Sequence, residues 1–193
     1  MSITETLEEA RRLNWKSDTR KLYESGEAAT NSFISSKDQD TKEFYAVTLS
    51  PSLSNFESKD DKDKFWKDFD ARERLVISLW NQVKHQLNRN LSNNYRRYPD
   101  KQLKDFVAIE HLDKNQKKLI HPHLHGTLAI PKELKQAFEE SLDEHGEDFT
   151  LNLALFDTSL DIRSVFVKHI PSPEDLNLWN GYVLKQQFGV INK

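Results

Sequence analysis

The chain of 193 residues contains no cysteine. Disulfide bonds, thiolate metal sites and cysteine nucleophiles are therefore excluded. Long apolar runs are also missing, and none approaches the roughly 20 residues that a membrane-spanning helix needs. The first residues, MSITETLEEARR, lack the apolar segment that is typical of a signal peptide. We therefore expect a cytoplasmic protein with no membrane partner.

Neither sign of charge dominates, because 28 Lys and Arg residues nearly balance 31 Asp and Glu residues, for a formal net charge of -3. This total neither indicates nor excludes a nucleic-acid partner, since a binding face can be basic on an acidic protein. Hydrophobic residues make up 36% of the chain and include four tryptophans, so a domain of this length can bury a proper core.

Hydrophobic patterning predicts an N-terminal helical arm at 1–42 and one domain at 43–193. Runs of β-branched and aromatic residues predict strands at 43–51, 105–110, 123–130, 149–156 and 161–170. Apolar residues at helical spacing, with Pro and Gly near the boundaries, predict helices at 62–91, 131–146 and 172–188. This order predicts an α+β fold in which helices pack on a five-stranded, largely antiparallel sheet.

Three of the seven histidines stand at alternate positions within IHPHLHGTLAIP, residues 120–131. Side chains alternate along a strand, so His121, His123 and His125 share one face and the leucines take the other. The same alternation on the preceding strand places Glu110 on the histidine side. Two imidazole nitrogens and a carboxylate suit a divalent ion with open positions for substrate oxygens. An exposed polar strand face would show the same alternation.

The last predicted helix carries Tyr182 and Lys185 in the stretch NLWNGYVLKQQF. Residues three apart lie on the same helical face. A phenol beside a cation suits covalent phosphoryl transfer, in which the phenol attacks and the cation offsets charge. Taken alone, this spacing is more often an interfacial tyrosine beside a solvated lysine.

The combination of these features, in this order, resembles the HUH endonuclease superfamily. AVTLSP at 46–51 looks like its first motif, HPHLHGTL matches the second through His123 and His125, and GYVLKQ matches the third. The sequence looks most like the rolling-circle replication initiators, or Rep proteins, that have a single catalytic tyrosine. The resemblance covers roughly residues 43–189 and implies the HUH nuclease fold with its ferredoxin-like or RRM-like core.

This resemblance implies a metal-dependent, site-specific endonuclease that nicks and rejoins DNA. Tyr182 would attack a phosphodiester in single-stranded or hairpin origin DNA, leaving a 5′-phosphotyrosine and a 3′-hydroxyl that primes replication of a plasmid, phage or similar small replicon. Lys185 would orient the phosphate or balance charge. His123 and His125, with Glu110, would hold Mg²⁺ or Mn²⁺.

A segment that mixes basic and aromatic residues follows the long predicted helix, at 84–104. Bases stack on tyrosine while arginine and lysine hold phosphates. The segment therefore supplies DNA-binding candidates, which are Tyr95, Arg96, Arg97, Tyr98 and Lys101. The solvated end of a helix would have a similar composition.

The chain has no GxxxxGKS or GxxxxGKT phosphate-binding loop, and so no helicase of its own. A host helicase and polymerase are the expected partners. Three alternatives stay open: a single-tyrosine transposase of the same superfamily, a DNA-binding module that cuts nothing, and a metal hydrolase without a covalent step. Joining of two different ends, absence of a covalent adduct and activity after Tyr182→Phe would distinguish them, respectively.

Overall fold

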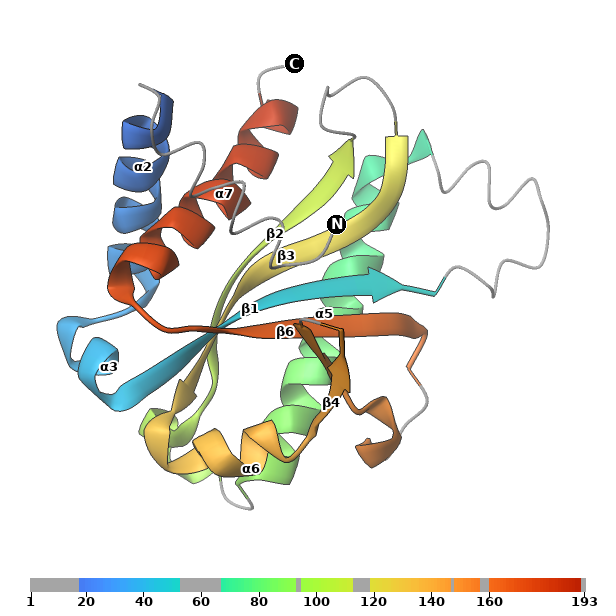
Figure 1. Cartoon of the computed structure of the whole chain (residues 1–193). Coiled ribbons are helices and arrows are strands. Elements are labelled where there is room, and N and C mark those ends of the chain that lie inside the picture. The colour runs from blue at the N-terminus through green and yellow to red at the C-terminus, as the bar shows by residue number, and fades with distance from the viewer. Residues whose placement is uncertain are drawn as a thin grey trace.

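The computed structural model describes residues 18–52, 67–92, 95–112, 119–146, 148–156 and 160–191. Its centre is one six-stranded antiparallel sheet with the strand order β2-β3-β1-β6-β5-β4 (Figure 1). The strands are β1 (Lys42–Pro51), β2 (Lys104–Leu112), β3 (Leu119–Pro131), β4 (Leu142–His145), β5 (Asp148–Leu151) and β6 (Ile162–Ile170). The predicted α+β class is confirmed, and the sheet has one strand more than the five expected.

Helices cover both faces of this sheet. On one face lie α5 (Phe69–Leu91) and α6 (Lys135–Glu139), and on the other α2 (Asp18–Phe33) and α7 (Pro173–Ile191) lie side by side (Figure 1). The shorter pieces are α3 (Ser36–Thr41), η1 (Tyr95–Arg97), η2 (Pro99–Lys101), η3 (Lys132–Leu134) and η4 (Leu153–Leu155). No helix in the described ranges is long and apolar enough to cross a membrane.

Two hydrophobic cores result from the alternation of side chains along the strands. The larger core lies under α5 and α6, where Trp80 and Phe138 pack against residues of β1 such as Val47. The smaller core lies under α7 and includes Trp179 and Val183. The helix α2 of the expected N-terminal arm packs directly on α7, so it belongs to this second layer.

The helix predicted at 131–146 is wrong in its second half. The turn η3 and the helix α6 end at Glu139, and the following residues form the edge strand β4. His145 pairs with Asp148, and the chain reverses at Gly146, whose φ of 65° is the left-handed conformation that glycine adopts without strain. Pairing with β5 therefore imposes a strand on LDEH, a sequence with little strand propensity of its own.

The strand predicted at 149–156 is also too long. β5 ends at Leu151, because the side chain of Asn152 accepts a hydrogen bond from the backbone N–H of Ala154 and starts the turn η4. The long predicted helix starts at Phe69 in the described part, where Asp68 accepts from the N–H of Ala71 as its N-cap. Residues 62–66 of that prediction lie outside the described residues.

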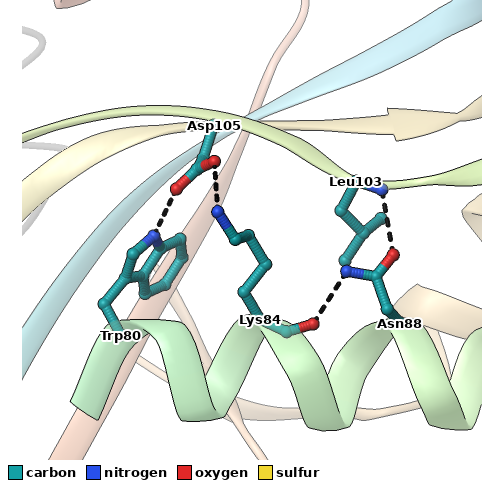
Figure 2. Close-up of polar contacts among 5 residues, drawn as sticks. All are labelled: Trp80, Lys84, Asn88, Leu103 and Asp105. Atoms are coloured by element: carbon teal, nitrogen blue, oxygen red, sulfur yellow. Dashed lines mark hydrogen bonds and ion pairs between the residues drawn. The ribbon is translucent and has the colours of Figure 1, made fainter. Parts of the chain in front are cut away.

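A polar clamp joins α5 to the start of β2 (Figure 2). The carboxylate of Asp105 accepts from Trp80 Nε1 at 2.6 Å and from Lys84 Nζ at 2.7 Å. One turn further along α5, Asn88 accepts from the backbone N–H of Leu103 at 3.0 Å (Figure 2). Trp80 is 1% exposed, so its indole N–H has no access to water as a replacement partner. The clamp therefore fixes the helix against the edge strand that carries Glu110.

We predict that Asp105→Ala lowers the free energy of unfolding by about 1–3 kcal/mol, because it leaves the buried indole N–H of Trp80 without an acceptor. Urea denaturation of the purified protein measures this change. Glu133→Ala removes an exposed carboxylate from η3 and serves as the control, with an expected change within about 0.5 kcal/mol. Equal losses for the two variants would contradict the role of the clamp.

Candidate functional site

Three neighbouring strands bring polar side chains to the sheet face that α7 partly covers. Glu110 on β2 is directly opposite His123 on β3, and Thr48 on β1 is directly opposite His125. Successive side chains along a strand point to opposite faces of the sheet, and this alternation places all four side chains on the same face. The structure thus brings together the three residues that the sequence predicts as metal ligands, and adds Thr48.

His125 is held through both of its ring nitrogens. Its Nε2 lies 3.0 Å from Oε2 of Glu110, and its Nδ1 lies 3.0 Å from Oγ1 of Thr48. An ionised carboxylate only accepts hydrogen bonds, so in the neutral ring Nε2 carries the proton and the hydroxyl of Thr48 donates to Nδ1. The side chains of His125 and Glu110 are only 14% and 13% exposed, which fixes the orientation of the imidazole in a site partly shielded from water.

His123 lies beside this pair, with its ring nearly parallel to that of His125. The two ring centroids are 6.3 Å apart and the planes differ by 20°. Burial of the ring, and next the neighbouring His125, lower the pKa of His123 below its ordinary value. The neutral imidazole, which is the form that binds a metal ion, is therefore favoured.

Tyr182 reaches the same place from α7. Its ring centroid lies 6.4 Å from that of His125 at an interplanar angle of 83°, and the tyrosine ring also stacks on Trp179 with the centroids 5.8 Å apart. Trp179 is fully buried and donates its indole N–H to the backbone oxygen of Gly126 at 2.8 Å. The stacking therefore fixes the tyrosine beside the histidines. The backbone of Lys185 belongs to α7, but its side chain lies outside the described residues.

A chain of buried hydrogen bonds seats α7 between β3 and α2. The hydroxyl of Thr127 donates to Asn180, the amide of Asn180 donates to Thr30 at 2.8 Å, and Thr30 donates to the backbone oxygen of Gly26 at 2.8 Å. At Gly26 the two helices touch through their backbones, because a Cβ there would lie 1.8 Å from the backbone oxygen of Asn177. The position of Tyr182 thus depends on the contacts of the whole helix.

A cavity of about 900 Å³ opens beside this cluster. Its first wall consists of residues already described together with His121: Thr48, Glu110, His121, His123, His125 and Tyr182. Its second wall comes mainly from β4, β5 and β6 and includes Asp143, His145, Asn152, Arg163 and Phe166. Much of the lining is polar, and the size suits an extended polar ligand rather than a single ion.

Within the described residues, no three His, Asp or Glu side chains are gathered closely enough to hold a metal ion as they stand. The hydrogen bond between Glu110 and His125 uses the same two atoms that would bind a cation. The donor set of two imidazoles and one carboxylate is chemically suited to a divalent ion. Binding one would require this hydrogen bond to open and the ring of His123 to turn toward the pair.

His111 follows Glu110 directly but faces the opposite side of the sheet, as the alternation predicts. Its ring is 5% exposed and lies 5.3 Å from that of Phe69 on α5. Burial, and then the charge of Arg72, lower the pKa of His111 to about 4. The guanidinium of Arg72 also donates to the backbone oxygens of His111 and Ile120, which ties α5 to β2 and β3 beside the site.

The structure places the predicted DNA-binding segment away from this cluster. Its members are Tyr95, Arg96, Arg97, Tyr98 and Lys101, in and around η1 and η2. These turns precede the first residue of β2, whereas Glu110 is near the last, and no member of the segment is among the described residues that line the cavity. Arg96 lies over the ring of Tyr95 at 5.8 Å, and Lys101 lies over that of Tyr98 at 5.5 Å. The five residues form a separate surface.

Two residues of the site did not follow from the sequence as functional candidates. Thr48 lies in the stretch AVTLSP, and only its pairing with His125 distinguishes it from any strand threonine. Trp179 precedes Tyr182 by three residues, which puts both on one helical face. That spacing was the available signal for an aromatic support under the tyrosine.

No protein-family model matches the chain, and no curated protein or solved structure is significantly similar to it. The geometry and chemistry of the residues themselves are therefore what indicates a function.

We predict that Gly26→Ala destabilises the protein by about 1–3 kcal/mol or more, because the added methyl group overlaps the backbone of α7 and must force the two helices apart. Thermal and urea denaturation measure the loss. Glu27→Ala is the matched control, since it changes the next residue of α2, whose side chain is exposed. A Gly26→Ala variant as stable as this control would contradict the backbone contact between α2 and α7.

Proposed function

We propose that this protein is an HUH-type endonuclease that nicks and rejoins single-stranded DNA through a 5′-phosphotyrosine at Tyr182. The nick would initiate rolling-circle replication of a small replicon such as a plasmid or phage. One observation carries the proposal. The ring centroid of Tyr182 lies 6.4 Å from that of His125, which is hydrogen-bonded to Glu110, and all three residues line a cavity of about 900 Å³. A candidate nucleophile and candidate metal ligands from distant parts of the chain thus meet at one opening.

The residues fit a divalent ion of the Mg²⁺ or Mn²⁺ type. His123, His125 and Glu110 would hold it, and the ion would polarise the scissile phosphate. Thr48 supports this assignment, because a hydroxyl can accept as well as donate. With Thr48 accepting from Nδ1–H, the Nε2 lone pair of His125 becomes available to the ion, so the same contact orients the ring in both states.

The proposed reaction is a transesterification that conserves the number of phosphoester bonds. The phenol oxygen of Tyr182 attacks the phosphorus, the bond from phosphorus to the 3′-oxygen breaks, and the proton of the phenol is balanced by protonation of the leaving 3′-hydroxyl. The 5′ end stays on the tyrosine as a phosphodiester, so attack by a 3′-hydroxyl rejoins the strand. Lys185, one turn further along the sequence of α7, is proposed to orient the phosphate.

We predict that Tyr182→Phe abolishes formation of a covalent protein–DNA adduct, because it removes the attacking oxygen and keeps the ring that stacks on Trp179. Incubation with Mn²⁺ and a labelled pool of random single-stranded DNA, followed by denaturing electrophoresis in SDS, measures the adduct. Tyr23→Phe is the matched control: Tyr23 lies on α2, where its hydroxyl accepts from Asn177, and it should leave the adduct unchanged.

Each other outcome of this experiment points to a different function. Cleavage that persists in Tyr182→Phe would identify a metal hydrolase without a covalent step. Tight DNA binding by the native protein, with no adduct under any metal, would identify a module that binds without cutting. An adduct that resolves by joining two different element ends would identify a transposase.

We further predict that removal of metal with EDTA, or the double substitution His123→Ala and His125→Ala, prevents adduct formation. Binding of Mn²⁺ itself, measured by calorimetry without DNA, should weaken at least ten-fold in the double variant, because two of the three proposed ligands are gone. His169→Ala serves as the control, since His169 contacts Glu43 at 2.8 Å and lies outside the cavity. Equal Mn²⁺ binding by all three proteins would refute the proposed ligands.

A further inference from the structure

We propose that Phe166 and His145, on the second wall of the cavity, form a subsite that holds one nucleobase of the strand next to the scissile phosphate. The identity of the ligand rests on the proposed function. The inference adds a residue-level determinant of which DNA position is cut.

Phe166 lies in the same row of the sheet as His125. Thr48 is directly opposite both His125 on β3 and Phe166 on β6, and Phe166 is in turn opposite Thr150 on β5. These side chains form one row across the same face. Neighbouring strands are about 4.8 Å apart, so Phe166 lies two strands, or about 10 Å, from His125. A DNA strand whose scissile phosphate lay at the histidines would therefore place its neighbouring bases over the ring of Phe166.

The second wall of the cavity combines aromatic rings with polar side chains. The rings of Phe166 and His145 are 5.2 Å apart and tilted by 58°, and Asp143, Asn152 and Arg163 line the same cavity. An aromatic face accepts a base by stacking, while an amide, a carboxylate and a guanidinium offer donors and acceptors to its polar edge. This combination of an aromatic face and convergent polar groups suits a nucleobase better than it suits a phosphate.

A purely structural role predicts a different behaviour for the two residues. Phe166 is partly buried and packs at the border of the smaller core. If the residue served only this core, its truncation would lower the free energy of unfolding and leave the affinity for DNA unchanged. His145 is exposed at the end of an edge strand and makes no such contribution to the core. Substitution of both residues, with a leucine that keeps apolar volume at 166, separates the two roles.

The test is an abasic scan of DNA binding in a Tyr182→Phe background, where no cutting occurs. A fluorescent oligonucleotide with the junction sequence recovered from the adduct is made with one abasic site at each position in turn, and fluorescence anisotropy gives the affinity. We expect one abasic position beside the junction to weaken binding about ten-fold or more. In the Phe166→Leu/His145→Ala variant the same abasic site should cause no loss of affinity. Phe166→Trp keeps an aromatic ring at this position, so with this substitution the abasic site should again weaken binding.

Phe149→Leu is the matched control, because Phe149 is an exposed phenylalanine directly opposite Val167, on the other face of the same strand pair. It should leave the scan unchanged. An abasic profile that is the same in the double variant as in the parent would overturn the subsite while the adduct assay still supports the nuclease. If no adduct forms, a mixed-sequence oligonucleotide replaces the junction sequence: a ten-fold weaker affinity of the double variant supports the subsite, and an equal affinity overturns it.

Discussion

The close seating of α7 on β3 is the constraint on which the candidate site depends. The indole of Trp179 lies over the sheet and donates to the backbone oxygen of Gly126, directly beside His125. A Cβ at position 126 would lie 2.4 Å from the backbone oxygen of Phe106, so the glycine permits the tight pairing of β2 with β3 at this point. Since Tyr182 stacks on the same indole, the distance between the tyrosine and the histidines is set by packing and does not depend on a mobile loop.

The polar groups of the site are held in place by their need for hydrogen-bond partners. Buried imidazole and carboxylate groups need partners, and His125 finds them in Glu110 and Thr48. On the proposed function a bound cation would replace one of these partners, and Glu110, now a hydrogen-bond acceptor, would then serve as a ligand. Because Glu110 and His125 are already in contact, these two proposed ligands would not have to be brought together from a distance.

Side-chain alternation was enough to predict that Glu110, His123 and His125 share one face, because a period of two survives any error in strand length. The start of the last helix at residue 172 was also predictable from the sequence. The hydroxyl of Ser172 accepts from the N–H of Asp175, as the side chain of an N-cap residue does. The strand β4 was not predictable, because pairing with β5 and not local propensity makes LDEH extended. The second wall of the cavity was therefore missed with it.

The composition of the cavity has a consequence for the order of events on the proposed function. Glu110 and Asp143 both line it, so an approaching phosphate would meet a carboxylate on either wall, and Arg163 lines the second wall as well. On the proposed function, a divalent ion held by Glu110 would reverse the sign of the electrostatic potential near the proposed position of the scissile phosphate. Metal and DNA would then favour each other's binding, and linkage would require each to tighten the binding of the other by the same factor. On the proposed function, a near-neutral protein would in this way bind single-stranded DNA weakly without metal and tightly only with the metal ion bound.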